Sequence, residues 1–478
     1  MMNRLLFITT VWLSVLCISE KTTAQTVVDL SASDYPVLHI HTVDSQMPQA
    51  DMIEPPEGQP GVSITNNSYV AGRMVMTVSN DTVYDSGSWE KNVSGMKIKR
   101  RGNSTGAYLD QHPYKIKLTQ PYDLLFRDDS IFAHKEWVLL SMYTWNVKMK
   151  NSESNILTVL GLILGKLLGQ PWTPHYSFVH VVLNGQYQGM YYLIEPVSRG
   201  EGRINTEKSG FIMEHDIFWW NEDKYIHTWY DSKSCAFTYK YPKSDNVTAE
   251  QENSIKAYLD ECERAIFTDG ENPFEKIDVE SFARFLLLHD LLGTDDSGGA
   301  NRFLVRRDSL SALLEMGPAW DFDSSFRSSL DYSLLRDYTD FYYPRLLTLP
   351  AFVTAYNTIW QNMADEIQWK LNEELDSFWT KYGSTFDYNM QLHQQLYPYE
   401  GRNTLKEQVD EIKEKMAQRI STVDRLVNEN ITVYHALHAN KENSNHITDL
   451  QGRCYHIEQT SLLPSGIYIR NGKKLIVK

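Results

Sequence analysis

The feature that most constrains how this chain folds is a run of local signals in its second half. Residues 282–292 are apolar at helical spacing, with Asp278 as a candidate N-cap and Gly293 at the end. Residues 302–307 and 312–316 read as strands, and turn-forming residues separate them. These signals predict a helix, a polar loop and a β-hairpin, in that order.

Carboxylates and one amide lie at the two ends of this predicted hairpin. Asp296 and Asn301 lie five residues apart before it, and Asp321 and Asp323 follow it. In protein kinases, an Asp that accepts the substrate hydroxyl proton has the same spacing to a metal-binding Asn, and a later Asp binds the metal under the phosphates. The pattern predicts a phosphoryl-transfer site with the hard oxygen ligands that magnesium prefers. Solvated turn carboxylates or helix caps remain the alternative for either half alone.

Several blocks of sequence occur in the order that one known family shows. The blocks are residues 101–104 (Arg-Gly-Asn-Ser) with 113–118, residues 137–140 with Tyr143, Lys150 and Asn151, residues 185–195, and residues 317–326, which contain Trp-Asp-Phe-Asp. Together they resemble the CotH kinase family, the spore coat protein H-like atypical kinases. The resemblance covers roughly residues 95 to 330.

The resemblance implies an α+β, two-lobed protein-kinase-like fold with a β-rich N-terminal lobe and a mostly helical C-terminal lobe. It also implies ATP-dependent phosphorylation of protein hydroxyls with Mg²⁺ or Mn²⁺. By the same resemblance, Asp296 is the catalytic residue and Asn301 and Asp321 are metal ligands, while Asp323 has a metal-binding or adjacent role. Asp295 is the alternative in the neighbouring register, but the five-residue spacing to Asn301 favours Asp296.

A basic strand and a polar turn are candidates for binding the nucleotide phosphates. Lys115 and Lys117 alternate with apolar residues and therefore face one side of a strand. We predict that one of them binds phosphate, with Lys117 preferred, and that Arg101 in the turn assists. An exposed charged strand face is the alternative. No Walker-type glycine loop is present, which argues against an ordinary P-loop NTPase.

Two glutamates complete the predicted nucleotide side. The helical run at residues 148–168 would pack behind the nucleotide, and Glu153 could pair with the strand lysine. A solvated glutamate in the first turn, favoured by the helix dipole, is the alternative for Glu153. Glu195 ends a strand-like run, and only the resemblance places it near the link between the lobes. An edge-strand carboxylate is its alternative.

The two ends of the chain predict export. Arg4, an apolar stretch at residues 5–18 and small residues before Gln25 predict a secretory signal peptide over residues 1–24. Near the other end, Asn471-Gly472 predicts a hairpin turn, in a segment that resembles the C-terminal sorting module of type IX secretion. The prediction is a protein secreted, held in the periplasm or displayed on the surface of a Gram-negative bacterium.

Between these ends, we predict a β-rich extension over residues 25–94, a CotH-like kinase domain over 95–430, and a sorting-like tail over 431–478. A formal net charge of -15 disfavours nucleic acid and anionic membrane surfaces as partners. The apolar stretch at residues 5–18 is too short for a transmembrane helix, and no other segment approaches the required length. The cysteines after the signal, Cys235, Cys262 and Cys454, have neither a disulfide-scaffold count nor zinc-site spacing.

Three functional classes follow. The first is an exported kinase acting on Ser or Thr of a secreted or surface protein. The second is a weakly active or inactive surface adhesion or scaffold protein with a kinase fold, because residues 144–146 depart from the family pattern and ATP is scarce outside the cell. The third is a glycosidase that uses Asp296 with Asp321 or Asp323 as its carboxylate pair.

Overall fold

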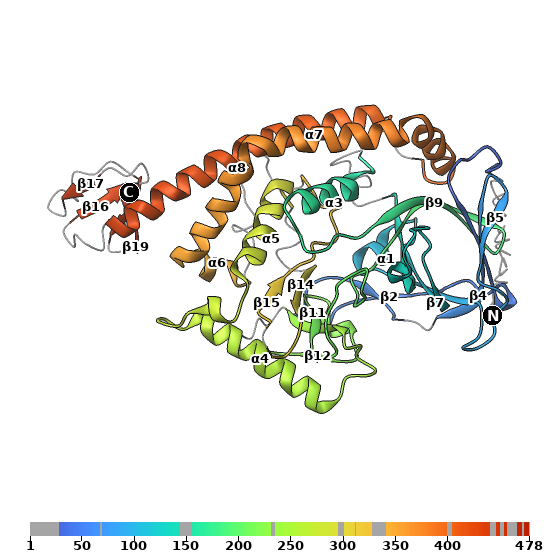
Figure 1. The fold of residues 1–478 in the computed structure, drawn as a ribbon, viewed down its shortest axis with the longest axis horizontal. Helices are drawn as coiled ribbons and strands as arrows, with labels where there is room; N and C mark the ends of the chain where they lie inside the picture. Colours follow the sequence, from blue (N-terminus) through green and yellow to red (C-terminus); the bar gives the residue numbers. More distant parts are fainter. Residues whose placement is uncertain are drawn as a thin grey trace, which may run out of the picture.

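The chain folds into a β-rich N-terminal part followed by a mostly helical part, as predicted (Figure 1). The computed structural model describes residues 28–66, 69–143, 154–230, 235–294, 301–310, 312–326, 341–398 and 404–439, and four strands between residues 446 and 477. The predicted signal peptide, Glu153 and Asp296 lie outside the described residues.

The N-terminal part is a closed barrel of seven strands, extended at one edge by β5 (Asp81–Asp85). Going round the barrel, the strands are β1 (Val37–Thr42), β9 (Tyr176–Leu183), β10 (Gln186–Ile194), β8 (His134–Ser141), β7 (Tyr114–Tyr122), β6 (Met96–Arg100) and β4 (Val70–Val78), which pairs again with β1. Strands β1 and β4 come from the predicted N-terminal extension, and β6 to β10 from the predicted kinase domain that starts at residue 95. All seven strands share one barrel, because β1 and β4 close it.

Alternating side chains explain how the barrel is filled. On β7, Tyr114, Ile116 and Leu118 are at most 3% exposed and lie in the interior, whereas Lys115 and Lys117 point outward. This confirms the predicted division of the strand into a core face and a charged face. The outer surface of β9 and β10 is also apolar where helices cover it, and Phe178 packs there against Phe386 with ring centroids 5.3 Å apart.

A second sheet of five strands follows the barrel. Its order is β12 (Tyr225–Ile226), β13 (Ala236–Tyr241), β11 (Phe211–Asp216), β14 (Arg302–Arg306) and β15 (Leu314–Met316). The predicted hairpin is confirmed, because β14 and β15 pair antiparallel with Leu304 opposite Met316. Short elements connect the larger ones: β2 (Met52–Ile53), β3 (Ser63–Ile64), α1 (Ser104–Tyr108) and single 3-10 turns, of which η3 (Trp219–Asn221) follows β11.

The helix predicted before the polar loop is α5 (Val279–Leu292). The Asp278 side chain caps it by accepting a hydrogen bond from the Ser281 amide at 2.8 Å, and Gly293 ends it with a φ of 58°. Almost all of α5 is buried, which suits a central helix. Around it lie α3 (Leu157–Leu167), α4 (Ala249–Phe267), α6 (Tyr343–Leu346), α7 (Pro350–Gln394) and α8 (Leu405–Ala439).

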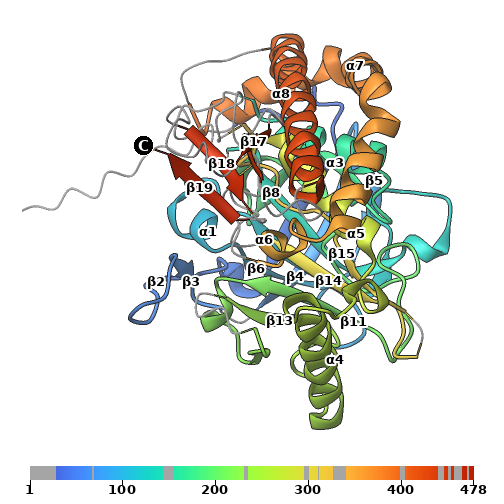
Figure 2. The same ribbon diagram turned by 90° about the vertical axis from the view of Figure 1, so that its left-hand side faces the viewer.

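Helices α7 and α8 run side by side along one edge of the molecule, opposite α4 (Figures 1 and 2). The four-stranded C-terminal sheet lies beyond the end of α8 (Figure 1) and has the order β17 (Cys454–His456), β16 (His446–Asp449), β18 (Gly466–Arg470) and β19 (Lys473–Val477). Strands β18 and β19 pair antiparallel, on either side of the predicted Asn471-Gly472 turn. In the described part of the chain, every helix is too short or too polar to cross a membrane.

Candidate active site

The segment after α5 is held against the segment that carries the predicted metal-binding aspartates. Thr294 and Ser324 hydrogen-bond through their hydroxyl groups, and the Phe326 amide donates to the Leu292 carbonyl oxygen at 2.8 Å. Thr294 is the last described residue before the segment that contains Asp296. The approach to Asp296 and the Asp321–Asp323 segment are therefore neighbours in space.

Two candidate metal ligands adopt a left-handed backbone conformation. Asn301 has a φ of 59° and Asp321 a φ of 65°. Asn and Asp tolerate this region better than most residues, and such conformations are common where a structure fixes a functional group. The Gly317 amide donates to the Phe303 carbonyl oxygen at 2.8 Å, so the chain that leads to Asp321 starts beside β14, directly after Asn301. Asp321 and Asp323 are both half-buried.

Phe322, between the two aspartates, is fixed by helix α3. Its side chain is 3% exposed and lies against Gly161, where an added Cβ would come within 2.1 Å of the Phe322 ring. Only glycine permits this approach. The predicted helix at residues 148–168 is wrong at its start, because residues 154–156 are not helical and α3 begins at Leu157, but its apolar side is buried as predicted, with Ile156, Leu160 and Leu164 fully buried. Helix α3 thus sets the position of the segment that carries Asp321 and Asp323.

Arg101 connects the barrel to the second half of the site. It follows β6 and is half-buried. Burial lowers the pKa of its guanidinium, and the negative charges of Asp321 and Glu214 act in the opposite direction. The Asp321 charge thus acts on Arg101, an interaction that the sequence alone could not establish.

The turn that presents Arg101 is itself anchored to both halves of the molecule. The Ser63 hydroxyl of β3 donates to Asn103 Oδ1 at 2.8 Å, and Asn221 Nδ2 of η3 donates to Ser63 Oγ at 2.8 Å. Gly102 has a φ of 94°, a conformation that favours glycine. Ser63 of β3 thus holds the Arg-Gly-Asn-Ser turn and links it to η3, which follows β11 of the second sheet.

Lys115 forms an ion pair with a glutamate of the neighbouring strand β8, and the pairing of Glu153 with the strand lysine stays a prediction because Glu153 lies outside the described residues. Its Nζ lies 3.0 Å from Glu136 Oε2, and Lys243 Nζ lies 3.2 Å from the same oxygen. Burial lowers the pKa of Lys115 to about 8, although the Glu136 charge opposes this. The pKa of Glu136 is about 2 because the charges of the two lysines outweigh the effect of its burial. The partner of the strand lysine is therefore available on the neighbouring strand β8.

Lys117, which the sequence favoured over Lys115, points outward and is exposed. Lys117 lies opposite Glu136 of β8 in the strand register. Among the described contacts, however, the lysine of β7 that forms an ion pair with Glu136 is Lys115. The alternation of the strand places both lysines on one face and cannot distinguish them. The geometry favours Lys115 as the phosphate-binding lysine.

Glu195 lies in a closed charge cluster at the end of β10. It is fully buried and accepts hydrogen bonds from Arg127 Nη2 at 2.9 Å and from the His175 amide at 3.0 Å. Arg203 Nε lies 3.4 Å from it. Burial acts to raise the pKa of Glu195, but these partners outweigh it and the pKa is about 2. These contacts favour a structural role over direct contact with a nucleotide.

Charged residues on β11 and β13 were not singled out as site residues from the sequence. Lys240 Nζ lies 2.5 Å from Glu214 Oε2. Burial lowers the pKa of Lys240, but the charges of Glu214, Glu222 and Asp216 raise it further than burial lowers it. Burial and the Glu214 charge raise the pKa of Asp216 to about 7. The sequence signal that could have identified these residues is the Glu214-His215-Asp216 run at the end of an apolar strand.

The donor atoms of the site fit Mg²⁺ or Mn²⁺ better than zinc. Among the described residues, no three His, Cys, Asp or Glu side chains are grouped as a metal site would require. Magnesium needs only one or two carboxylates besides the phosphates, and Asn301, Asp321 and Asp323 offer amide and carboxylate oxygens. Cys235 and Cys262 are both buried, and in the part of the chain that the structure describes neither lies in a group of side chains that could bind zinc.

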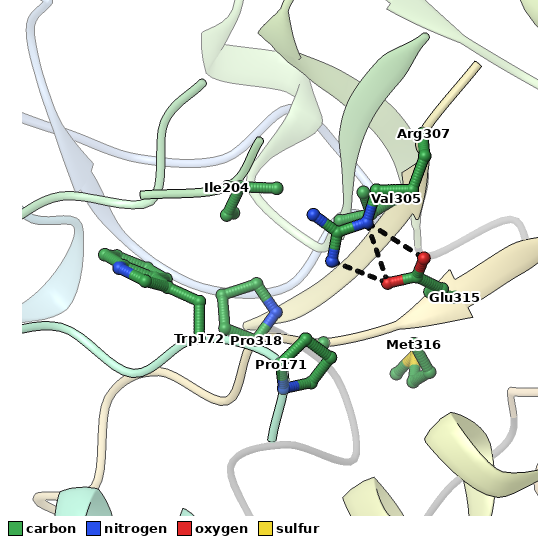
Figure 3. Close-up of a pocket in the computed structure, with 9 residues that line it drawn as sticks. Pro171, Trp172, Ile204, Val305, Arg307, Glu315, Met316 and Pro318 are labelled. Atoms are coloured by element: carbon green, nitrogen blue, oxygen red, sulfur yellow. Dashed lines mark hydrogen bonds and ion pairs between the residues drawn. The ribbon is translucent and has the colours of Figure 1, made fainter. Parts of the chain in front are cut away.

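A shallow pocket with a volume of only about 10 Å³ lies near the cis Gly317-Pro318 bond but contains none of the predicted site residues (Figure 3). Trp172 and Pro318 line one part of it, and Arg307 and Glu315 form an ion pair at its edge, with atoms 2.8 Å apart (Figure 3). It is small and lined largely by apolar side chains, so we place the chemistry at the charged residues instead.

Comparison with known proteins agrees with the resemblance noted in the sequence. A family model described as CotH kinase protein matches residues 98–423, which is more than half of the chain. A search of curated proteins found no significant match. The matched region begins in β6 and ends in α8, and so includes Arg101, Lys115, Asn301 and Asp321. The chain belongs to the CotH kinase family.

Proposed function

We propose that the protein is an exported kinase that transfers the γ-phosphoryl group of ATP to Ser or Thr hydroxyls of a secreted or surface protein. Family membership supports the reaction class. The observation that carries the proposal is the contact between the Thr294 and Ser324 hydroxyl groups, because it brings the segment that leads to Asp296 beside the segment that carries Asp321 and Asp323. Phosphoryl transfer depends mainly on such positioning and charge neutralisation.

Each residue then has a distinct role. Asp296 would accept or orient the proton of the acceptor hydroxyl, and Asn301, Asp321 and Asp323 would bind Mg²⁺ or Mn²⁺. The bound metal would neutralise charge on the phosphates. Lys115, oriented by Glu136, and Arg101 would hold the phosphates in place. The buried Phe322–Gly161 contact would keep the metal-binding segment in position.

Incubation of the purified chain with γ-labelled ATP and Mg²⁺ or Mn²⁺, alone and with secreted proteins, tests the proposal. We expect Asp321→Ala to reduce labelling by about 100-fold or more, because it would remove several kcal/mol of metal-dependent charge stabilisation. Asp296→Ala should have an effect of similar size. The matched control is Asp410→Ala, since Asp410 is exposed on α8 and pairs only with a surface lysine there.

The same assay separates the alternatives. Equal labelling by wild type, Asp296→Ala and Asp321→Ala would refute the assignment of the site. A wild-type chain that neither binds nor uses ATP would support the adhesion or scaffold function instead. Release of sugars from a glycan panel, lost in Asp296→Ala, would support the glycosidase.

Export is part of this proposal. The apolar stretch after Arg4 and the small residues before Gln25 support a signal peptide, and the C-terminal sheet of β16 to β19 would serve as a sorting module. Mass spectrometry of the exported protein should find an N-terminus at Gln25. Detection of residues 1–24 on the exported chain would refute the signal-peptide assignment.

A further inference from the structure

An unbalanced group of charges lies where the second sheet meets the barrel. Lys115 of β7 and Lys243, which follows β13, both contact Oε2 of Glu136 on β8, at 3.0 and 3.2 Å. Two ammonium groups therefore share a single carboxylate oxygen. Lys99 of β6 lies opposite Lys115 in the strand register on the same face of the barrel, where the charges of Glu222 and Glu136 both act on it.

Lys243 reaches this point from a fixed piece of backbone. Its carbonyl oxygen accepts hydrogen bonds from the amides of Asn246 and Val247 at 2.9 and 3.0 Å. Directly afterwards, Thr248 caps α4 in a reciprocal capping box with Gln251. The side chain is 42% exposed, so its ammonium group is accessible from the solvent.

The excess positive charge suits an anion with several negative charges. Like charges held this close repel each other, and the effect is stronger where burial lowers the local dielectric. Burial lowers the pKa of both Lys99 and Lys115, and the Lys243 charge lowers that of Lys115 further. Lysine is a strongly hydrated point charge that commonly binds phosphate. An oligophosphate placed between Lys115 and Lys243 would relieve the repulsion.

We propose that Lys243 binds the terminal phosphates of the nucleotide and makes the site selective for nucleoside triphosphates over monophosphates. The inference rests on the proposed function for the identity of the ligand. It adds a binding residue from the second sheet to a phosphate site otherwise formed by the barrel. Nucleotide binding then bridges the two parts of the molecule through the Lys243 side chain.

A neighbouring lysine shows why Lys243 in particular is suited to this role. Lys240 lies three residues earlier and pairs with Glu214, with the charges of Asp216 and Glu222 close by. Carboxylates outnumber this lysine, whereas lysines outnumber the carboxylate at Glu136. Lys240 is neutralised by the protein, and Lys243 retains charge for a ligand.

Calorimetric titration of the whole chain tests the proposal with three probes: a non-hydrolysable ATP analogue, AMP and tripolyphosphate, each with Mg²⁺. For Lys243→Ala we expect about tenfold or greater loss of affinity for the analogue and for tripolyphosphate, the effect of one charge-assisted contact. AMP affinity should not change. Lys243→Arg should restore most of the affinity for the analogue, and Lys208→Ala, at an exposed lysine, should leave all three affinities unchanged.

Thermal unfolding without ligand provides a second readout. Lys243→Ala removes one attraction to Glu136 and one repulsion from Lys115, so its midpoint should stay close to that of wild type, whereas loss of a purely structural lysine would lower it. Equal losses for the analogue and AMP, no loss for either, a lower midpoint, or no binding of any probe by wild type would each overturn the proposal. If wild type fails to transfer phosphate but Lys243→Ala still loses affinity selectively, the proposed function fails and this inference stands.

Discussion

Glu195 and Glu136 lie on either side of one buried arginine, and their surroundings differ in charge balance. Arg203 places Nε 3.4 Å from Glu195 Oε1, and its Nη2 donates to the backbone oxygen of Glu136 at 2.9 Å. Around Glu195, two carboxylates meet two guanidinium groups, since Asp123 pairs with Arg127 at 2.9 Å. Around Glu136, two ammonium groups meet one carboxylate.

The difference separates charges that stabilise the fold from charges that, in our proposal, bind a ligand. The Glu195 cluster is deeply buried, balanced and extensively hydrogen-bonded, and Arg203 also stacks over Trp137 at 5.1 Å. The Glu136 cluster is partly open to solvent and positively charged. Arg203 links them, so the balanced cluster fixes the strand from which Glu136 orients Lys115.

Breaking the balanced cluster should have the largest effect. We expect Glu195→Gln to lower the free energy of unfolding by about 3–5 kcal/mol, because Arg203 would remain buried without its counter-charge and Arg127 would be left with Asp123. Urea unfolding at pH 7 would measure this. The matched control is Glu374→Gln in the exposed pair with Lys166, where we expect less than about 1 kcal/mol.

The pH dependence follows from the lowered pKa of Glu195. The pKa is about 2 in the folded state against an ordinary 4.5, so the unfolded chain binds more protons as pH falls. The stabilisation is complete above about 4.5 and is lost as pH falls towards 2. Glu195→Gln should lack this part of the acid limb. An unchanged acid limb in the variant would contradict the role of the cluster.

Glu136→Gln should have a smaller effect on stability and a distinct effect on ligand response. We expect a loss of about 1–3 kcal/mol in the free protein, because Lys115 and Lys243 would lose their shared acceptor. A non-hydrolysable ATP analogue should raise the unfolding midpoint more in this variant than in wild type, since phosphate would replace the missing negative charge. Thermal shifts with and without the analogue measure both effects.

The balanced cluster supplies the control for that experiment. In Glu195→Gln, the shift caused by the analogue should equal the wild-type shift, because no phosphate is needed there. If both variants respond to the analogue alike, the contrast between the clusters is wrong.

Lys115 gives a still smaller effect that depends on pH. Its pKa of about 8 predicts that affinity for the ATP analogue falls above pH 8, by about tenfold per unit at most, as the ammonium group loses its proton. Calorimetry between pH 7 and 9.5 would measure this. Lys115→Arg, which stays charged, should flatten the profile. A wild-type profile that is already flat would exclude Lys115 as the titrating group.

The same group should affect stability with the opposite sign. Between about pH 8 and its ordinary value of 10.5, the unfolded chain holds a proton on Lys115 that the folded chain has released. The contribution of Lys115 to the free energy of unfolding therefore rises with pH over this range, while ligand affinity falls. Comparing wild type with Lys115→Arg isolates this contribution.

Local patterns predicted the elements but not these charge clusters. Neighbouring residues alone specify α5, which begins after Asp278, continues through an apolar run and ends at Gly293. The alternation of apolar and charged residues likewise specifies the two faces of β7. The packing of α7 and α8 on α5 joins segments that lie far apart in the sequence, which neighbouring residues do not encode.

The pairings of Lys115 with Glu136 and of Arg203 with Glu195 depend on which strands and loops meet. No local spacing encodes that, since Lys243 reaches Glu136 from a different sheet. The sequence therefore indicated which residue types form the site. It could not distinguish Lys115 from Lys117. It also could not distinguish Glu195, which lies in a cluster of balanced charge, from Glu136, which two lysines share.

Lys117→Ala should have the smallest effect and is the sharpest test of that distinction. Lys117 shares the outer face of β7 with Lys115 but is exposed. Its side chain is therefore hydrated in both the folded and the unfolded chain, and its removal should cost little stability. We expect a change in the free energy of unfolding within about 0.5 kcal/mol and less than about a twofold change in affinity for the ATP analogue. Lys115→Ala, measured beside it, should lose about tenfold or more. If the two variants exchange these outcomes, Lys117 binds the phosphate, and the Lys115–Glu136–Lys243 group is a structural ion cluster like that of Glu195.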